Sequence, residues 1–266
     1  MDAHLRRAVE FLEHDPLRNI VLLKTLFYYP HAIRCRFHEG PEAAGALLLL
    51  PGDASSFDRR NYPGTDYIVF IAAAHPALLP ELLLHVPTGK KLLFKLMDPR
   101  HHAAAAAHFS LERANAFVSF TAPHGRAMAP AGGVTVSGTL DSACLDLYVA
   151  MGHSREELKD HFASGQALSF TWYEKDKPLA SCFTFPNYGR IHEIAGVYSD
   201  PGHRRRGLAR RVVETALHHL GHAGRLARYQ AQEDNRASIL LAESIGLRHV
   251  VTYVHWRHDP AMKEMV

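Results

Sequence analysis

The sequence predicts an α/β (α+β) protein of two domains, and three observations support this prediction. The chain has 266 residues, which is long for one average domain and sufficient for two of roughly 130 residues. Hydrophobic residues make up 47% and charged residues 21%, a composition typical of a globular protein with a full apolar core. Both halves also show the same order of patterns, namely helix, helix, three strands, helix, strand, helix and strand. This shared order suggests an internal duplication, although no residue-level repeat accompanies it.

In the first half, helical periodicity begins near Leu5 and ends near His14. Asp15-Pro16 is typical of a helix start and predicts a second helix that runs to about Tyr28. A polar loop is expected over residues 52–65. The other elements are expected at Ala32–Phe37, Ala44–Leu50, Tyr67–Ala72, Pro76–His85, Lys91–Met97, Pro99–His108 and Leu111–Phe120.

Residues 122–133 are rich in proline and glycine and contain few large apolar side chains. We therefore expect a first domain over 1–124, a linker over 125–133 and a second domain over 134–266. In the second half, Ser154 with Glu157 three residues later resembles a capping box that opens a helix. The elements expected there are Asp141–Met151, Ser154–Phe162, Ala167–Glu174, Pro178–Phe185, Arg190–Tyr198, Gly207–His219, Arg225–Gln230, Arg236–Ile245 and Val250–Trp256.

Three consecutive arginines, residues 204–206, lie between a predicted strand and a predicted helix. The start of a helix presents unpaired backbone N–H groups and the positive end of the helix dipole, so it is suited to binding an anion. Gly207 lets a phosphate approach the backbone, and Ala209 keeps the next turn small. Arginines at this end of a helix oppose its dipole. A bound phosphate therefore explains them better than a solvated basic helix start does.

This turn resembles the cofactor signature of the GNAT N-acetyltransferase superfamily, Gln/Arg-x-x-Gly-x-Gly/Ala, in the form Arg204-x-x-Gly207-x-Ala209. Further on, Asn235-x-x-Ser238-x-x-Leu241-Ala242-Glu243 resembles the family's second cofactor motif. The resemblance covers roughly residues 167–256 and implies acetyl-CoA as co-substrate, without a metal. It also implies two tandem GNAT-like domains, each a mixed, mostly antiparallel sheet flanked by helices, with a splayed central pair of strands. The first half lacks the arginine loop and is expected to be a degenerate copy.

The resemblance further implies a role for each matching position. The backbone N–H groups of residues 205–209 would hold the pyrophosphate of coenzyme A, and the preceding strand end would contact the pantetheine arm. Asn235 and Ser238 would contact that arm or the neighbouring strand end, and Asn235 would also cap its helix. The implied cofactor contacts are Val197, Tyr198, Ser199, Arg204, Arg205, Arg206, Gly207, Leu208, Ala209, Arg210, Asn235 and Ser238.

The candidate catalytic residue is Glu193, on the strand that leads into the turn, where members of this family often hold a general base. The alternative is that Glu193 is an ion-paired strand residue. Many members have a tyrosine general acid seven residues after the asparagine, but this position is Ala242 here. Tyr198 and Tyr229 are alternative candidates for the general acid. A thiol of pKa about 8.5 can also leave as the thiolate without obligatory protonation.

The expected function is transfer of an acyl group, expected to be acetyl, from acetyl-CoA to a primary amine of a small molecule by direct attack in a ternary complex. One alternative is a non-catalytic acyl-CoA-binding sensor with the same fold. Nucleic-acid binding is disfavoured because it predicts a basic stripe with interleaved aromatic residues. The net charge is +3, the three cysteines are widely spaced, and no apolar run is long enough for a membrane span. We expect a cytoplasmic monomer or homodimer without a membrane partner.

Several histidines and cysteines have structural interpretations. His218, His219 and His222 are interpreted as cations at a helix end rather than as metal ligands. His101-His102 is interpreted as a surface pair. Cys144 and Cys182 are expected to be small buried hydrophobes.

Overall fold

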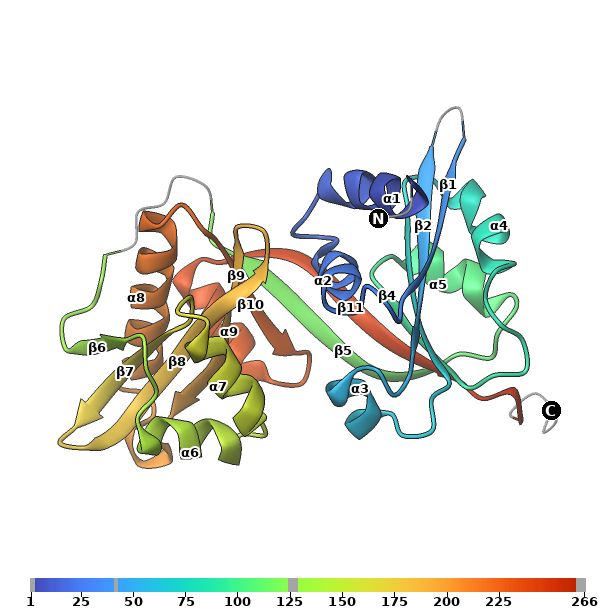
Figure 1. The fold of residues 1–266 in the computed structure, drawn as a ribbon. Coiled ribbons are helices and arrows are strands. Elements are labelled where there is room, and N and C mark those ends of the chain that lie inside the picture. The colour runs from blue at the N-terminus through green and yellow to red at the C-terminus, as the bar shows by residue number, and fades with distance from the viewer. Residues whose placement is uncertain (1–2, 41–42, 124–128, 262–266) are drawn as a thin grey trace. The chain divides into compact units, whose positions relative to one another are not determined.

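The computed structural model describes residues 3–40, 43–123 and 129–261, which divide into two compact units (Figure 1). One unit consists of the residues up to Phe117 together with those from Val251 onward, and the other is Val118–Val250. The expected linker lies over 125–133, and its residues 125–128 fall outside the described ranges, so the domain limits taken from the sequence stay a prediction. Strands β5 (Glu112–Thr121) and β11 (Arg248–His258) each begin in one unit and end in the other.

The first unit is a mixed sheet with strand order β1-β2-β3-β4-β11, in which only the pairing of β3 with β4 is parallel among the described strands. Its strands are β1 (Arg34–Glu39), β2 (Ala44–Pro51), β3 (Tyr67–Ala73) and β4 (Leu92–Leu96), with part of β11. Its helices are α1 (Ala3–Glu13), α2 (Ile20–Tyr28), α3 (Ser56–Asn61), α4 (Leu79–Leu83) and α5 (Pro99–Ala106), with a short 3₁₀ turn at Pro76–Leu78.

Both faces of this sheet are covered, which explains why its strands read as continuous apolar runs rather than alternating ones. Leu47 and Val69 face α4 and α5 and belong to a cluster that includes Leu82 and Phe94. Successive side chains of a strand point to opposite faces, so Leu48 and its alternate neighbours face the other side, where α1 and α2 lie (Figure 1).

Two local predictions for this unit were wrong. The second helix begins at Ile20 and not at Pro16, because Asp15 accepts the N–H of Arg18 at 3.1 Å in a single closed turn. Asn19 then turns its side chain back to donate to the carbonyl of Leu12 at 2.9 Å. In addition, the loop expected over 52–65 contains α3, whose N-cap Ser55 accepts the N–H of Asp58 at 3.2 Å. A six-residue helix is too short to show helical periodicity.

The second unit has the strand order β5-β10-β9-β8-β7-β6. Its strands are β6 (Val134–Ser137), β7 (Leu168–Glu174), β8 (Lys177–Tyr188), β9 (Ile191–Ser199) and β10 (Leu226–Gln232), with part of β5. Its helices are α6 (Ser142–Ala150), α7 (Arg155–Ala163), α8 (Leu208–His222) and α9 (Arg236–Ile245), with a 3₁₀ turn at Pro201–His203. The capping box is confirmed on one side, since Ser154 accepts the N–H of Glu157 at 3.3 Å. The edge strand β6 was not expected from the sequence.

Helices pack on both faces of the second sheet (Figure 1). One face and the helices α8 and α9 form the largest apolar cluster of this unit, with Val212, Ala216 and Ile239 among its members. On the other face, Tyr148 of α6 and Leu158 of α7 pack around Phe183 of β8.

The central parallel strands of each unit diverge, as the resemblance implies. Strands β9 and β10 pair from Ile191 to Ile194, and β9 then continues to Ser199 without β10 beside it. Strands β3 and β4 pair from Tyr67 to Phe70, and β3 then continues to Ala73. The expected fold class is therefore confirmed.

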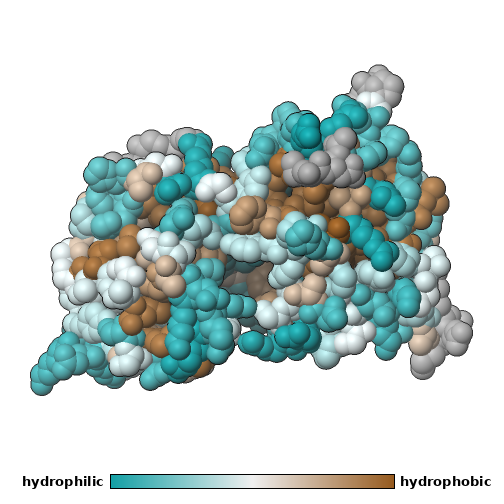
Figure 2. Space-filling view, in the orientation of Figure 1, coloured by the Kyte–Doolittle hydropathy of each residue, from teal (hydrophilic) through white to brown (hydrophobic). Residues whose placement is uncertain are grey.

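The lengths of the helices and the hydropathy of one face complete the description of the fold. No helix in the described ranges combines the length and apolarity that a bilayer crossing requires. On the face seen in Figure 2, hydrophilic residues are interspersed with smaller apolar areas in each unit.

Candidate functional site

A cavity of about 750 Å³ opens in the second unit beside the part of β9 that has left β10. The end of β9, the turn after it, the first residues of α8 and one side of α9 line it, with Met151 at the end of α6. All of the predicted cofactor contacts except Arg206 line this cavity. The tertiary structure thus brings together two motifs that are about thirty residues apart in sequence, as cavities at the carboxyl ends of parallel strands commonly do.

The turn into α8 is held by Asp200, a buried residue that the sequence analysis did not single out. Its N–H donates to the carbonyl of Leu179 at 2.7 Å, and its carboxylate accepts the N–H of Gly202 at 3.0 Å and the ammonium of Lys177 at 2.7 Å. The carboxylate also forms a hydrogen bond with the ring of His203 at 2.8 Å. The hydrogen bonds with His203 and Lys177 are the main cause that holds the pKa of Asp200 at about 2. In the sequence, Asp200-Pro201-Gly202 was the available signal for this turn.

The backbone of the turn alternates in handedness. Arg205 has φ of 62° and Gly207 has φ of 74°, both in the left-handed region, while Arg204 is extended. A turn of alternating handedness can direct successive N–H groups toward one point, as in an anion-binding nest. No side chain of the described chain caps the start of α8 at Gly207, so its first N–H groups remain available.

The cavity is electropositive. Arg204, Arg205 and Arg210 line it, and no carboxylate side chain from the described residues does. Arg210 is also paired with Glu214, from its Nε to Oε1 at 2.8 Å, so it is already partly neutralised. Arg206 is exposed and lies outside the cavity lining.

The strand end beside the cavity is shaped by Gly196, which the sequence analysis did not identify. Between the pairs Ser181–Tyr198 and Phe183–Ala195, one residue of β8 faces two residues of β9, which makes a β-bulge. Gly196 has φ of 61°, and a Cβ placed there would lie 2.6 Å from the ring of Phe183. A glycine inside a strand pattern was the signal for such a bulge.

The second motif opens α9. Asn235 is its N-cap, and its side chain accepts the N–H of Ser238 at 3.1 Å, which confirms the expected cap. Ala242, at the position of the family's tyrosine, is fully buried in the apolar cluster under α8 and α9. Tyr229 belongs to the same cluster, and burial raises its pKa to about 12. Tyr198 lines the cavity.

Glu193 does not line the cavity, and it is held in a polar cluster on the α6 and α7 side of the sheet. Its Oε2 accepts from Nη1 of the buried Arg228 and from the side-chain nitrogen of Asn187, each at 2.5 Å. Two other atoms of these partners, Nε of Arg228 and Oδ1 of Asn187, are buried without a hydrogen-bond partner among the described residues. Glu193 is therefore ion-paired, and its role as a base stays a prediction.

The remaining interpretations concern histidines and cysteines. His101 is only 3% exposed, so its interpretation as a surface residue was wrong. Cys144 and Cys182 are both buried, as expected. In the ranges that the structure describes, no cluster of three or more His, Cys, Asp or Glu side chains is placed to hold a metal ion.

Comparison with known proteins agrees with this geometry. Residues 140–247 match the model of the acetyltransferase (GNAT) family, and this part of the chain is a GNAT acetyltransferase domain. Among curated protein sequences, none is significantly similar to the chain.

Solved structures resemble the whole chain at low identity. A Drosophila protein has a TM-score of 0.62 at 10% identity and covers 98% of this chain and 97% of its own. A tandem GNAT protein from the clavulanic acid biosynthesis pathway has a TM-score of 0.53 at 14% identity with the same coverage, 98% and 97%. A GCN5-related N-acetyltransferase from Sphaerobacter thermophilus has a TM-score of 0.58 at 12% identity over 83% of this chain and 81% of its own. The chain therefore has the fold of two GNAT-like domains in tandem.

Proposed function

We propose that the second unit transfers an acetyl group from acetyl-CoA to a primary amine of a small molecule, by direct attack within a ternary complex. The family of this domain indicates acyl transfer in general. The cavity beside β9 supports acetyl-CoA as the acyl donor.

The cavity supports this choice because its parts match the parts of coenzyme A. The nest at Arg205 and Gly207, with the start of α8, presents N–H groups and positive charge to a pyrophosphate. The unpaired edge of β9 offers backbone groups to the amides of a pantetheine arm. Apolar side chains of α9, Leu240 and Leu241, line the cavity where a flexible arm would pack.

In this proposal, the polar cluster around Glu193 would supply the acceptor groups that an incoming ammonium needs. Glu193 would take its proton, directly or through a water molecule. Asn187 holds Glu193, and its unpartnered Oδ1 is a further acceptor beside that carboxylate. The departing thiolate needs no obligatory acid. Tyr198 lines the cavity and is the better placed of the two tyrosines to supply a proton, because Tyr229 is buried in the apolar cluster and burial raises its pKa to about 12.

The direct experiment is to mix the purified chain with acetyl-CoA and a panel of amino acids, polyamines, aminoglycosides and short peptides, and to record thiol release. Amine-dependent release is the expected result. Binding of acetyl-CoA without release for any amine would favour the alternative, a non-catalytic sensor with the same fold. Absence of acetyl-CoA binding would contradict both.

The cavity itself is tested at Gly207. Space around this residue is open, since nothing lies within 4 Å of a Cβ built there, and aspartate and asparagine both tolerate its positive φ. Gly207→Asp places a carboxylate where the pyrophosphate is expected and should weaken acetyl-CoA binding by at least ~100-fold, about 2.7 kcal/mol. Gly207→Asn, the neutral variant of equal size, should lose far less. Equal affinities of the two variants for acetyl-CoA, measured by calorimetric titration, would show that the pyrophosphate does not bind at this turn.

A further inference from the structure

The first unit contains a separate cavity of about 380 Å³, which the proposed acyl transfer does not use. It lies where β3 continues past its pairing with β4, and Ala73 and Met97 at the ends of these strands line it. Crevices at the carboxyl ends of parallel strands are common ligand sites in open α/β sheets. At this size the cavity suits a small metabolite, since pockets for drug-sized ligands start at about 300 Å³.

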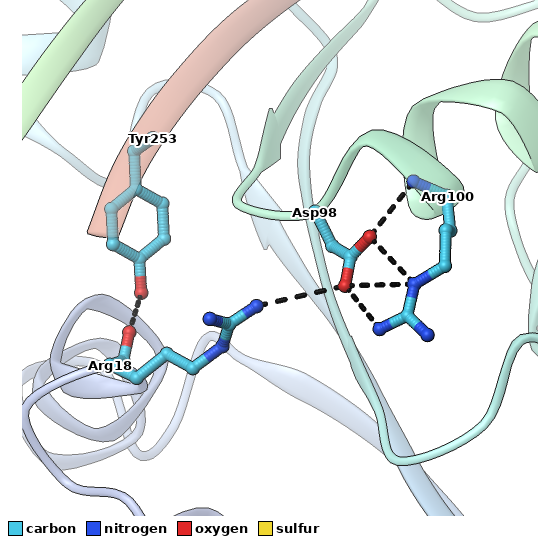
Figure 3. Close-up of polar contacts among 4 residues, drawn as sticks. All are labelled: Arg18, Asp98, Arg100 and Tyr253. Carbon is cyan, nitrogen blue, oxygen red and sulfur yellow. Dashed lines mark hydrogen bonds and ion pairs between the residues drawn. The ribbon is translucent and has the colours of Figure 1, made fainter. Parts of the chain in front are cut away.

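A carboxylate between two arginines forms the polar wall of the cavity (Figure 3). Asp98 is 8% exposed and accepts the N–H of Arg100 at 2.9 Å, its Nε at 3.0 Å and its Nη2 at 2.7 Å. The side-chain hydrogen bonds from Arg100 hold the pKa of Asp98 at about 2, so it is ionised. Nη2 of Arg18 approaches the same carboxylate at 3.6 Å. The lone pairs of Asp98 are thus taken, and it offers little to a ligand.

Arg18 differs from Arg100 because its guanidinium makes no hydrogen bond to any described residue, although it lines the cavity. Its backbone is nevertheless fixed. The hydroxyl of Tyr253, on β11, donates to the carbonyl of Arg18 at 2.5 Å (Figure 3). The guanidinium of Arg18 therefore presents a set of forked donors on the wall, which suits a carboxylate.

His101 provides the opposite kind of group. Its side chain is 3% exposed and lines the cavity, and its Nδ1 is buried without a hydrogen-bond partner among the described residues. Burial is the main cause that lowers the pKa of His101, so the ring is neutral at pH 7. In the neutral tautomer with its proton on Nε2, Nδ1 is an acceptor that lacks a donor. Buried polar groups are normally hydrogen-bonded, so this nitrogen is a candidate contact for a ligand in the cavity.

We propose that this cavity binds a small carboxylic acid that carries an amino or hydroxyl group next to its carboxyl group. The carboxylate meets Arg18, the amino or hydroxyl group donates to Nδ1 of His101, and an apolar side chain packs against Phe11 and Met97. The charged side chains that line the cavity balance, with Arg18 and Arg100 against Asp15 and Asp98. This balance disfavours a polyanion such as a nucleotide.

The test is calorimetric titration of the full chain with the twenty standard amino acids, lactate and 2-hydroxy-3-methylbutyrate. Isovalerate, which has a carboxylate but no neighbouring donor, is the comparison ligand. We expect at least one amino or hydroxy acid to bind, and isovalerate to bind at least tenfold more weakly. Which of the two classes binds identifies the donor. Titrations of Gly207→Asp should give the same affinities, because the site lies in the other unit.

Two variants locate the binding. Arg18→Gln and His101→Phe should each weaken the binding at least tenfold, while Arg6→Gln, at an exposed arginine of α1, should leave it unchanged. Thermal unfolding of each variant shows whether it is folded. If His101→Phe does not fold, the affinity of Arg18→Gln alone tests the proposal. Binding by none of the acids, or equal affinity in wild type and Arg18→Gln, would overturn the proposal. Isovalerate binding as tightly as the best acid would also overturn it.

Discussion

Single residues shape the candidate acetyl-CoA site. Gly196 allows β9 to bulge at the point where it has parted from β10, and Gly207 allows the turn to expose its N–H groups. Each has a positive φ, which costs an L-residue roughly 1–2 kcal/mol. The two sites differ in their surroundings, because Gly196 is packed against Phe183 and Tyr148 whereas Gly207 is open.

The packing at Gly196 gives a prediction for stability. Gly196→Ala should lower the free energy of unfolding by about 2–5 kcal/mol, the sum of backbone strain and overpacking of the two rings. Gly189→Ala is the matched control, because Gly189 also has a positive φ, of 52°, but no atom lies within 4 Å of its Cβ position. Urea denaturation followed by circular dichroism measures both. Equal losses in the two variants would show that the rings yield and that only backbone strain counts.

At the scale of elements, the candidate site is built from helix starts. Helix α8 begins at Gly207 without a side-chain cap, which leaves its N–H groups for a ligand. Helix α9 begins at Asn235, whose side chain satisfies its own helix and lines the cavity as well. The start of a helix can therefore leave its N–H groups for a ligand or have them capped by its own side chain, and the N-cap residue decides between the two.

Removing the N-caps of α9 and α7, one at a time, separates the contribution of a cap to stability from its contribution to binding. Asn235→Ala and Ser154→Ala each delete an N-cap acceptor, so each should lower the free energy of unfolding by about 1 kcal/mol. Ser154 caps α7 and does not line the cavity, so only Asn235→Ala should weaken acetyl-CoA binding. Denaturation and calorimetric titration of both variants check this. A similar loss of affinity in Ser154→Ala would mean that stability alone accounts for the effect.

At the scale of the whole molecule, the two compact units do not follow the order of the chain. The last part of β11 pairs with β4 in the first unit, from Val254 to His258. The end of β5 belongs to the second unit, where Thr121 donates to the carbonyl of Ala227 at 2.7 Å and Phe120 lies in the main apolar cluster. The first unit thus contains the end of β11 from the second half of the sequence, and the second unit contains the end of β5 from the first half.

This exchange predicts how fragments fold. The apolar cluster under α8 and α9 lies entirely within residues 118–250, so a fragment of that range should unfold cooperatively. A fragment of residues 134–266 lacks Phe120, and losing a buried phenylalanine costs about 3–5 kcal/mol out of a total of 5–15 kcal/mol. We expect it to be much less stable or unfolded. Thermal denaturation of both fragments tests this, and equal melting temperatures would contradict it.

Much of the site could be predicted because its signals are local. The order of residues around Arg204, Gly207 and Asn235 carries both the helix starts and the phosphate-binding chemistry, and hydrophobic periodicity places the strand before them. Gly196 had a usable signal that was overlooked. By contrast, α3 was too short to show a period.

The sequence by itself determined the types of most elements, the two-domain composition, and the motifs that the cavity beside β9 collects. Those properties depend on neighbouring residues and on periods of two and 3.6 residues. Only the tertiary structure decided that β5 and β11 are shared between the units, that Glu193 is paired with Arg228, and that His101 is buried with an unpartnered nitrogen. These facts depend on which distant segments pack together, and the free energy of such contacts is not written in any local pattern.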